Sequence, residues 1–225
     1  MATTSINMNS DNRIRLKYPL AETMFHSSMV KFLKFLFRSI MILDVEGKEK
    51  LPDEGPAVIA ANHVTNMDVF PLQLSIQRPV FFMGKAELFE NPVIHYLFRQ
   101  LGAFPVYRGE RDEWAIDHAK KVLNAGNLLG MFPEGTRSRG RGLKVARTGA
   151  ARLAIELHCP VIPISIDGSH KFFNEFPRRN NVRVVIGDTI IAERGELPIG
   201  MTDRIMNEIA RNLPDNLRGV YQIGK

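Results

Sequence analysis

Short, mostly apolar runs separated by helical patterns constrain the fold of this chain most strongly. The runs are bounded by glycine, proline or polar residues and are too short for helices, so they predict buried strands at 56–61, 79–83, 128–132 and 161–166. Further strands are expected near 44–47, 103–107 and 182–186. Apolar residues at helical spacing predict helices at 92–101, 112–125, 148–157 and 202–213, the last capped by Thr202.

Strands that alternate with helices predict an α/β fold with a mostly parallel central sheet and crossover helices on its faces. No repeat or linker divides the chain, so a single domain is expected. Pro163 lies within one of the predicted strands and argues against a purely central position for that strand.

Residues 20–43 form the most apolar stretch of the chain. Lys31, Lys34 and Arg38 interrupt it at spacings of three and four, which places them on one face of a helix. These charges argue against a transmembrane span and favour an amphipathic helix on the membrane surface, its cations on anionic lipid. Its apolar membrane contacts would be Phe32, Phe35 and Leu36. The alternative is a helix packed on the core with a solvated basic edge.

Residues 1–17 carry no periodic signal and are expected to form a disordered or loosely bound arm. The predicted organisation is therefore an N-terminal arm and interfacial helix over 1–43, followed by an α/β domain over 44–225. The first residues are polar and lack the apolar core of a secretory signal, so the chain is expected to be exposed to the cytosol.

The chain is basic, with a net charge of +6 and an isoelectric point near 9.6. This balance indicates an anionic partner, and charge alone leaves nucleic acid, anionic lipid and phosphorylated small molecules open. Cys159 is the single cysteine, which excludes a disulfide within the chain and any metal site of several cysteines.

His63 and Asp68 lie at the junction between a predicted strand and the helix predicted to follow it. On one continuous helix the two side chains would point apart, so a contact between them requires the chain to bend. A carboxylate on one ring nitrogen would fix the tautomer of the imidazole and prepare it for general base catalysis. The alternative is a histidine that serves only the core and an acid in the first turn of a helix.

A polar loop, Pro133-Glu134-Gly135-Thr136-Arg137-Ser138, follows the apolar run 128–132. Gly135 permits a tight turn, Thr136 supplies a hydroxyl, and Arg137 supplies a guanidinium that can bind a phosphate monoester. The alternative is a polar turn with an internal ion pair between Glu134 and Arg137.

Together with Asn62-His63 and Asp68, the blocks at 102–108, 131–138 and 161–166 resemble the glycerolipid acyltransferases, the 1-acylglycerol-3-phosphate acyltransferases. The resemblance covers most of residues 45–190. A histidine and an aspartate at this spacing are common by chance, whereas the pair together with Phe-Pro-Glu-Gly-Thr-Arg-Ser is specific.

The resemblance implies transfer of a fatty acyl group from an acyl thioester to the free hydroxyl of lysophosphatidate, giving phosphatidic acid for phospholipid biosynthesis. His63, oriented by Asp68, would act as the base in a direct transfer. No serine or cysteine lies in a nucleophile motif, so an acyl-enzyme is not required. No metal and no redox cofactor are expected, and acyl-CoA or acyl carrier protein would be the donor substrate.

The resemblance also implies a site for the phosphate of the substrate. Its residues would be Lys85, Arg108, Glu134, Gly135, Thr136 and Arg137. Glu134 cannot face a phosphate favourably, so its expected roles are to orient Arg137 or to bind glycerol hydroxyls. Lys85 is equally consistent with a solvated surface lysine, and Arg108 with an ion pair to Glu110 or Asp112. The basic loop 138–148 would contact anionic headgroups or the donor, or is solvated.

The rival hypotheses are the same chemistry on glycerol 3-phosphate or on another lysolipid or lipid amine, and a membrane-binding protein without catalysis. The expected partners are lysophosphatidate, an acyl thioester, an anionic membrane surface and, as one candidate donor, acyl carrier protein. Nucleic acid is not expected. The expected location is peripheral, on the cytoplasmic face of a membrane.

Overall fold

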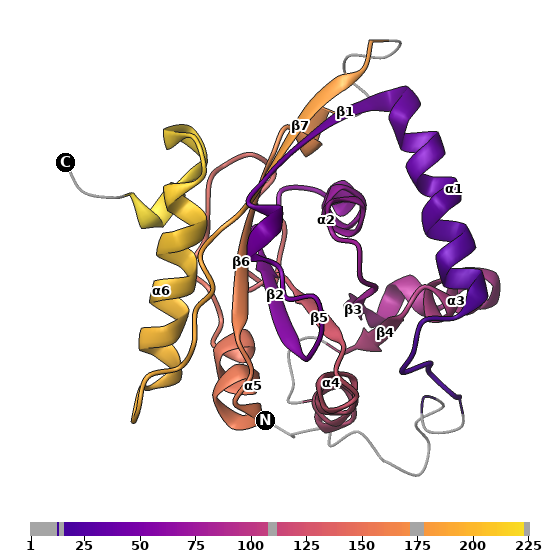
Figure 1. The fold of residues 1–225 in the computed structure, drawn as a ribbon, viewed down its shortest axis with the longest axis horizontal. Coiled ribbons are helices and arrows are strands. Elements are labelled where there is room, and N and C mark those ends of the chain that lie inside the picture. Colours follow the sequence, from indigo (N-terminus) through magenta and orange to yellow (C-terminus); the bar gives the residue numbers. More distant parts are fainter. Residues whose placement is uncertain (1–12, 14–15, 108–111, 172–177, 223–225) are drawn as a thin grey trace, which may run out of the picture.

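The computed structural model of the chain describes residue 13 and residues 16–107, 112–171 and 178–222. Its strands are β1 (Met41–Glu46), β2 (Ala57–Ala61), β3 (Val80–Lys85), β4 (Ala103–Val106), β5 (Leu128–Met131), β6 (Val161–Asp167) and β7 (Asn180–Ile186). They form one sheet in the order β1-β7-β6-β2-β5-β3-β4 (Figure 1). Every neighbouring pair is parallel except β6 and β7. The predicted α/β fold with a mostly parallel sheet is confirmed.

Helices cover both faces of this sheet. They are α1 (Met24–Ile40), α2 (Val69–Ser75), α3 (Pro92–Gln100), α4 (Glu113–Asn124), α5 (Gly149–Leu157) and α6 (Pro198–Arg211). α1 and α2 lie on one face and α4, α5 and α6 on the other (Figure 1). In the described part of the chain, no helix combines the length and the apolar character needed to cross a bilayer.

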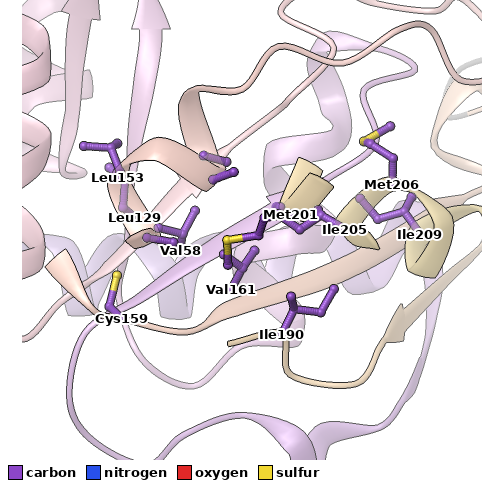
Figure 2. Packing of buried hydrophobic residues seen from close by; sticks show 14 of the residues in the cluster. Val58, Leu129, Leu153, Cys159, Val161, Ile190, Met201, Ile205, Met206 and Ile209 are labelled. Carbon is purple, nitrogen blue, oxygen red and sulfur yellow. The ribbon is translucent and has the colours of Figure 1, made fainter. Parts of the chain in front are cut away.

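β2 lies at the centre of the sheet and is completely buried, as its wholly apolar sequence predicts. On the α5 and α6 side, sheet residues such as Val58, Leu129 and Val161 pack against Met201 and other residues of α6 (Figure 2). Cys159 belongs to this cluster, and burial raises the pKa of its thiol to about 11.

The N-terminal helix is shorter than the sequence predicts. α1 ends at Ile40, and the residues up to Leu43 that were expected in the helix belong instead to β1, an edge strand parallel to β7. In β1 the inward residues Met41, Leu43 and Val45 alternate with exposed ones, which is the burial period of a strand. The apolar run across this boundary hid the change of period.

Pro163 does occupy a central strand, contrary to expectation. The β2–β6 ladder continues through it, so its missing N–H faces the β7 side of the strand. There the antiparallel pairing with β7 begins only at Ile164, while Val161 bridges Ile190. The proline therefore lies where that ladder is interrupted, and its carbonyl accepts from Gly187 N–H (2.8 Å). The proline therefore removes a donor on the β7 side only, and the ladder to β2 continues through it.

α6 begins earlier than predicted. Pro198 starts it, because proline suits the first helical turn, and Thr202 lies inside the helix rather than at its cap. The Thr202 hydroxyl donates to the Pro198 carbonyl (2.7 Å).

Arg13, expected in a loosely bound arm, is buried against Tyr107, Asp112 and Trp114. Its guanidinium forms two hydrogen bonds with Asp112 (2.5 and 3.0 Å) and lies between the rings of Tyr107 and Trp114. Asp112 also caps α4 by accepting from Ala115 N–H (3.1 Å). This arginine thus ties the N-terminal segment to the start of α4.

His118 on α4 is buried between aromatic rings. It stacks on Trp114 (ring centroids 5.2 Å apart, 2° between planes) and meets Phe104 edge to face. Burial, assisted by the nearby charge of Lys121, lowers the pKa of His118 to about 4 from its usual 6.5.

We expect His118 to make the fold sensitive to acid. As the pH falls below 6.5, the unfolded chain takes up a proton on His118 before the folded protein does, so the free energy of unfolding decreases until about pH 4. The loss should approach about 3 kcal/mol. Urea denaturation at about pH 7 and about pH 4 should show a smaller loss for His118→Phe than for the wild type. An equal loss in both proteins would contradict this assignment.

Candidate active site

The chain turns sharply between the end of β2 and the start of α2, and the site is built on this turn. Asn62 fixes its first half, because its Nδ2 donates to the Ile166 carbonyl (2.9 Å) and its Oδ1 accepts from Ile166 N–H (2.7 Å). The side chain thus extends the β2–β6 ladder beyond its last backbone pair. A short 3₁₀ turn, Asn66–Asp68, then brings Asp68 back toward His63.

His63 and Asp68 form a hydrogen-bonded pair at this turn. Nδ1 of His63 lies 2.8 Å from Oδ2 of Asp68, whose side chain is fully buried. The same Oδ2 accepts from Val64 N–H (2.7 Å) and Thr65 N–H (2.9 Å). Because these contacts use the carboxylate as an acceptor, Nδ1 carries a proton and Nε2 of the neutral imidazole keeps a free lone pair.

The imidazole is also held by its face. Phe132, the residue after β5, stacks on His63 with ring centroids 4.1 Å apart and 19° between the planes. His63 is 8% exposed, so only a small part of the residue is open to solvent. The carboxylate at one nitrogen and the aromatic ring at one face together fix the orientation of the ring.

The loop after β5 is hydrogen-bonded to the same turn. Ser138 N–H donates to the His63 carbonyl (2.7 Å), and Arg139 N–H donates to the Val64 carbonyl (3.2 Å). Gly135 has φ of +64°, a conformation that favours glycine. These contacts place the backbone of the polar loop directly beside the histidine.

Glu134 has a different place from the one predicted. It is buried, and its two carboxylate oxygens accept backbone N–H groups, one from His63 (2.8 Å) and one from Lys144 (3.0 Å). Burial raises the pKa of Glu134, while both hydrogen bonds oppose the rise. Because both oxygens of Glu134 accept backbone N–H groups, this carboxylate neither binds phosphate nor orients Arg137. It joins the loop to the turn that holds His63.

Arg137 and Thr136 lie exposed on the same loop. Within the described residues, the Arg137 guanidinium has no hydrogen-bond or ion-pair partner, so the internal pair with Glu134 does not form. The backbone around Arg137 is held by Lys144, whose Nζ donates to the Arg137 carbonyl (2.9 Å). The arginine therefore offers all its donors to an anion.

A cavity of about 610 Å³ opens beside the loop, between α4 and α5 at the carboxyl ends of three strands. Met83, Val106 and Met131 supply an apolar wall, and Arg147 and Arg152 supply charge. The Arg147 side chain packs over the loop glycine, since a β-carbon at Gly135 would lie 3.1 Å from Arg147 Nε. The sequence marked Arg147 only as part of a basic loop, with nothing to show that it borders a cavity.

Of the other predicted phosphate ligands, Lys85 is less favourably placed. Lys85, at the end of β3, is exposed and forms an ion pair with Glu87 (2.7 Å), as the surface alternative expects. Arg108 lies outside the described residues. Its suggested partner Asp112 is occupied by Arg13.

Known proteins resemble this chain in sequence and in fold. Residues 42–167 match the Acyltransferase family. The 1-acyl-sn-glycerol-3-phosphate acyltransferase of Bacillus subtilis is 30% identical over 72% of this chain and 82% of its own length. The chloroplastic 1-acyl-sn-glycerol-3-phosphate acyltransferase BAT2 of Brassica napus is 28% identical over 81% of this chain and 55% of its own length.

The chain spans about half the length of several curated relatives, as it does for the Brassica enzyme. A solved structure is similar as well: the crystal structure of the 1-acyl-sn-glycerophosphate acyltransferase PlsC from Thermotoga maritima has a TM-score of 0.64 and 26% identity. The similarity covers 80% of this chain and 76% of that one. The family match includes the turn with His63 and Asp68 and the loop with Arg137, and the chain belongs to the Acyltransferase family.

Proposed function

We propose that this protein transfers a fatty acyl group from an acyl thioester to the free hydroxyl of 1-acylglycerol 3-phosphate, giving phosphatidic acid. The observation that carries the proposal is the His63–Asp68 pair, whose turn is hydrogen-bonded to a loop with an arginine that has no partner among the described residues. The names of the similar proteins from Bacillus subtilis and Brassica napus support the choice of substrate.

In the proposed reaction, Nε2 of His63 takes the proton from the acceptor hydroxyl as its oxygen attacks the thioester carbonyl. The tetrahedral intermediate then collapses, the carbon–sulfur bond breaks, and the imidazolium returns the proton to the departing thiolate. Asp68 stabilises the imidazolium between these steps and remains a carboxylate. Holding both substrates at this edge of the sheet supplies much of the acceleration.

Arg137 is the proposed principal ligand of the acceptor phosphate, because a free guanidinium can bind phosphate through two hydrogen bonds. Arg108 and Lys85 remain candidates for the same anion, with Gly135 and Thr136 shaping the loop that presents Arg137. The donor, acyl-CoA or acyl carrier protein, enters as a substrate, and the proposed chemistry uses no separate cofactor.

We further propose that α1 lies on the cytoplasmic face of a membrane. Phe32, Phe35 and Leu36 are 57%, 75% and 45% exposed. With about 100° of rotation between successive residues, they lie on a different side of α1 from the buried Phe37. The exposed cations lie on a third side, next to the exposed apolar residues: Lys31, Lys34 and Arg38. Exposed apolar side chains beside cations suit anionic lipid.

Helix α3 extends this exposed apolar surface. Tyr18, just before α1, is hydrogen-bonded to His95 of α3 (2.8 Å), which places the start of α1 near α3. On α3, Val93 is 73% exposed and Tyr96 is 54% exposed. We propose that a membrane that receives α1 also meets these side chains of α3.

The proposed function predicts acceptor-dependent release of free thiol from an acyl thioester. His63→Ala should lower this release by about 100-fold or more, because the variant lacks the general base. The measurement is thiol release from acyl-CoA and from acyl carrier protein, with and without lysophosphatidate. His158→Asn is the matched control, since His158 is exposed, ends α5 with φ of +51° and lies outside the site.

Release that ignores the acceptor would indicate a thioesterase, and release that depends on glycerol 3-phosphate instead would indicate another acceptor. Wild-type protein that releases no thiol from either donor would contradict acyl transfer.

Glu134→Gln should separate the loop from the catalytic turn. The amide replaces one accepting oxygen with a donor, so one of the N–H groups of His63 and Lys144 loses its partner. We expect unfolding free energy to fall by roughly 1–3 kcal/mol and turnover to fall with it. Chemical denaturation and the thiol assay measure both effects. Stability and turnover equal to those of the wild type would show that this carboxylate has no such role.

Phe35→Ser should weaken binding to vesicles that contain an anionic phospholipid by roughly tenfold, since inserting one phenylalanine is worth about 1.5–3 kcal/mol when complete. Co-sedimentation with vesicles measures the change. Ile199→Ser is the control, because Ile199 on α6 is also exposed (64%) but lies on the other face of the sheet. Equal losses for both variants would argue against a membrane role for α1.

A further inference from the structure

We propose that Ser169 is a positioning residue of the active site: its hydroxyl fixes the rotation of the Asp68 carboxylate and, through it, the orientation of His63. Ser169 Oγ donates to Asp68 Oδ1 at 2.5 Å, and Ser169 is 1% exposed. The consequence for turnover rests on the proposed acyl transfer, whereas the geometry does not.

The two oxygens of Asp68 are held from different directions. Oδ2 accepts from His63 Nδ1, Val64 N–H and Thr65 N–H, which all belong to the turn itself. Oδ1 accepts from Ser169 and, at 3.4 Å, from the hydroxyl of Thr65, which also accepts from Met67 N–H. Ser169 therefore makes the short contact on Oδ1. Among the described residues, it is the one donor to Asp68 from outside residues 63–68.

The backbone before Ser169 is shaped to deliver it. Gly168 has φ of +87°, and a β-carbon there would collide with the Asn181 carbonyl, so the turn requires glycine. The Gly168 carbonyl accepts from Nδ2 of the buried Asn180 (2.6 Å) and from Lys171 N–H (3.1 Å). The turn after β6 is thus held through the Gly168 carbonyl, by a side chain of β7 and by its own backbone.

The distance between this turn and the catalytic turn is fixed as well. Asn62, directly before His63, bonds both backbone groups of Ile166, shortly before Ser169. The ends of β2 and β6 are therefore clamped together at the level of the site. Asp68 and Ser169 belong to the short turns that follow these two clamped strands, so their hydrogen bond needs little further ordering of the chain.

The chemical role follows from what a carboxylate does when one oxygen is released. With Oδ1 held by Ser169, Oδ2 stays aimed at Nδ1–H of His63, and Nε2 keeps its lone pair toward the substrate hydroxyl. Without Ser169 the carboxylate can rotate, the Nδ1–H bond weakens, and the histidine spends less time in the productive tautomer. Ser169 itself touches no reacting atom.

The test compares Ser169→Ala with Ser165→Ala in the full chain. Ser165 is a matched control, because it lies four residues earlier on β6, is 2% exposed and donates one hydrogen bond, to the Ile209 carbonyl (2.8 Å) rather than to Asp68. We expect kcat of Ser169→Ala to fall about tenfold, with an unchanged KM for lysophosphatidate, and kcat of Ser165→Ala to stay at the wild-type level. Ser169→Thr, which keeps the hydroxyl, should recover most of the rate.

A second readout does not depend on the reaction. The Nδ1–H proton of His63, hydrogen-bonded to a buried carboxylate, should give a far-downfield proton NMR signal in the wild type and in Ser165→Ala. The signal should broaden or vanish in Ser169→Ala. Should Ser169→Ala unfold, Ser169→Cys keeps a similar volume with a much weaker donor and takes its place in both measurements.

The outcomes separate the two proposals. Wild-type protein with the downfield signal but without acceptor-dependent thiol release would refute the proposed function and leave the role of Ser169 to the NMR comparison. An unchanged signal in Ser169→Ala would overturn the positioning role, whatever happens to the rate. An equal loss of kcat in Ser165→Ala would overturn it too. So would a Ser169→Ala variant in which KM rises and kcat stays unchanged.

Discussion

Burying a negative charge is the constraint on which the candidate active site depends. Asp68 and Glu134 are both buried, and within the described residues neither forms an ion pair with a lysine or arginine. A buried carboxylate must be compensated, and here backbone N–H groups do most of this. Those N–H groups belong to the turn after β2 and the loop after β5. The turn around His63 and the loop around Arg137 are therefore ordered by the same hydrogen bonds that make the two charges tolerable.

The sequence predicted most of the sheet because buried parallel strands are wholly apolar and short, and such runs are visible without any knowledge of pairing. It did not predict β1 from Met41, because an apolar run crosses the boundary between α1 and that strand. The place of Pro163 was also hidden, since the break in its ladder depends on where β7 ends. The first error concerns the boundary between a helix and a strand, and the second concerns a strand partner, which periodicity does not identify.

The same limit applies to the site. His63 and Asp68 are near neighbours in the chain, so their contact could be predicted from a local bend. Glu134 meets His63 across 71 residues, and Ser169 meets Asp68 across 101. These contacts follow from the strand order, in which β2 lies between β5 and β6, so that the segments after all three strands converge at one edge. Arg13 gave no signal at all, because a single cation in a polar segment does not reveal a buried partner.

The position of Cys159 protects the protein from acylation of its own thiol. Acyl thioesters react with thiolates by exchange, so a protein that handles them risks acylating its own cysteines. Here the single cysteine lies in the core beneath α5 and α6, and its raised pKa keeps it a thiol near neutral pH. In the proposed reaction, the acyl thioester would therefore meet no exposed, ionised cysteine of this protein.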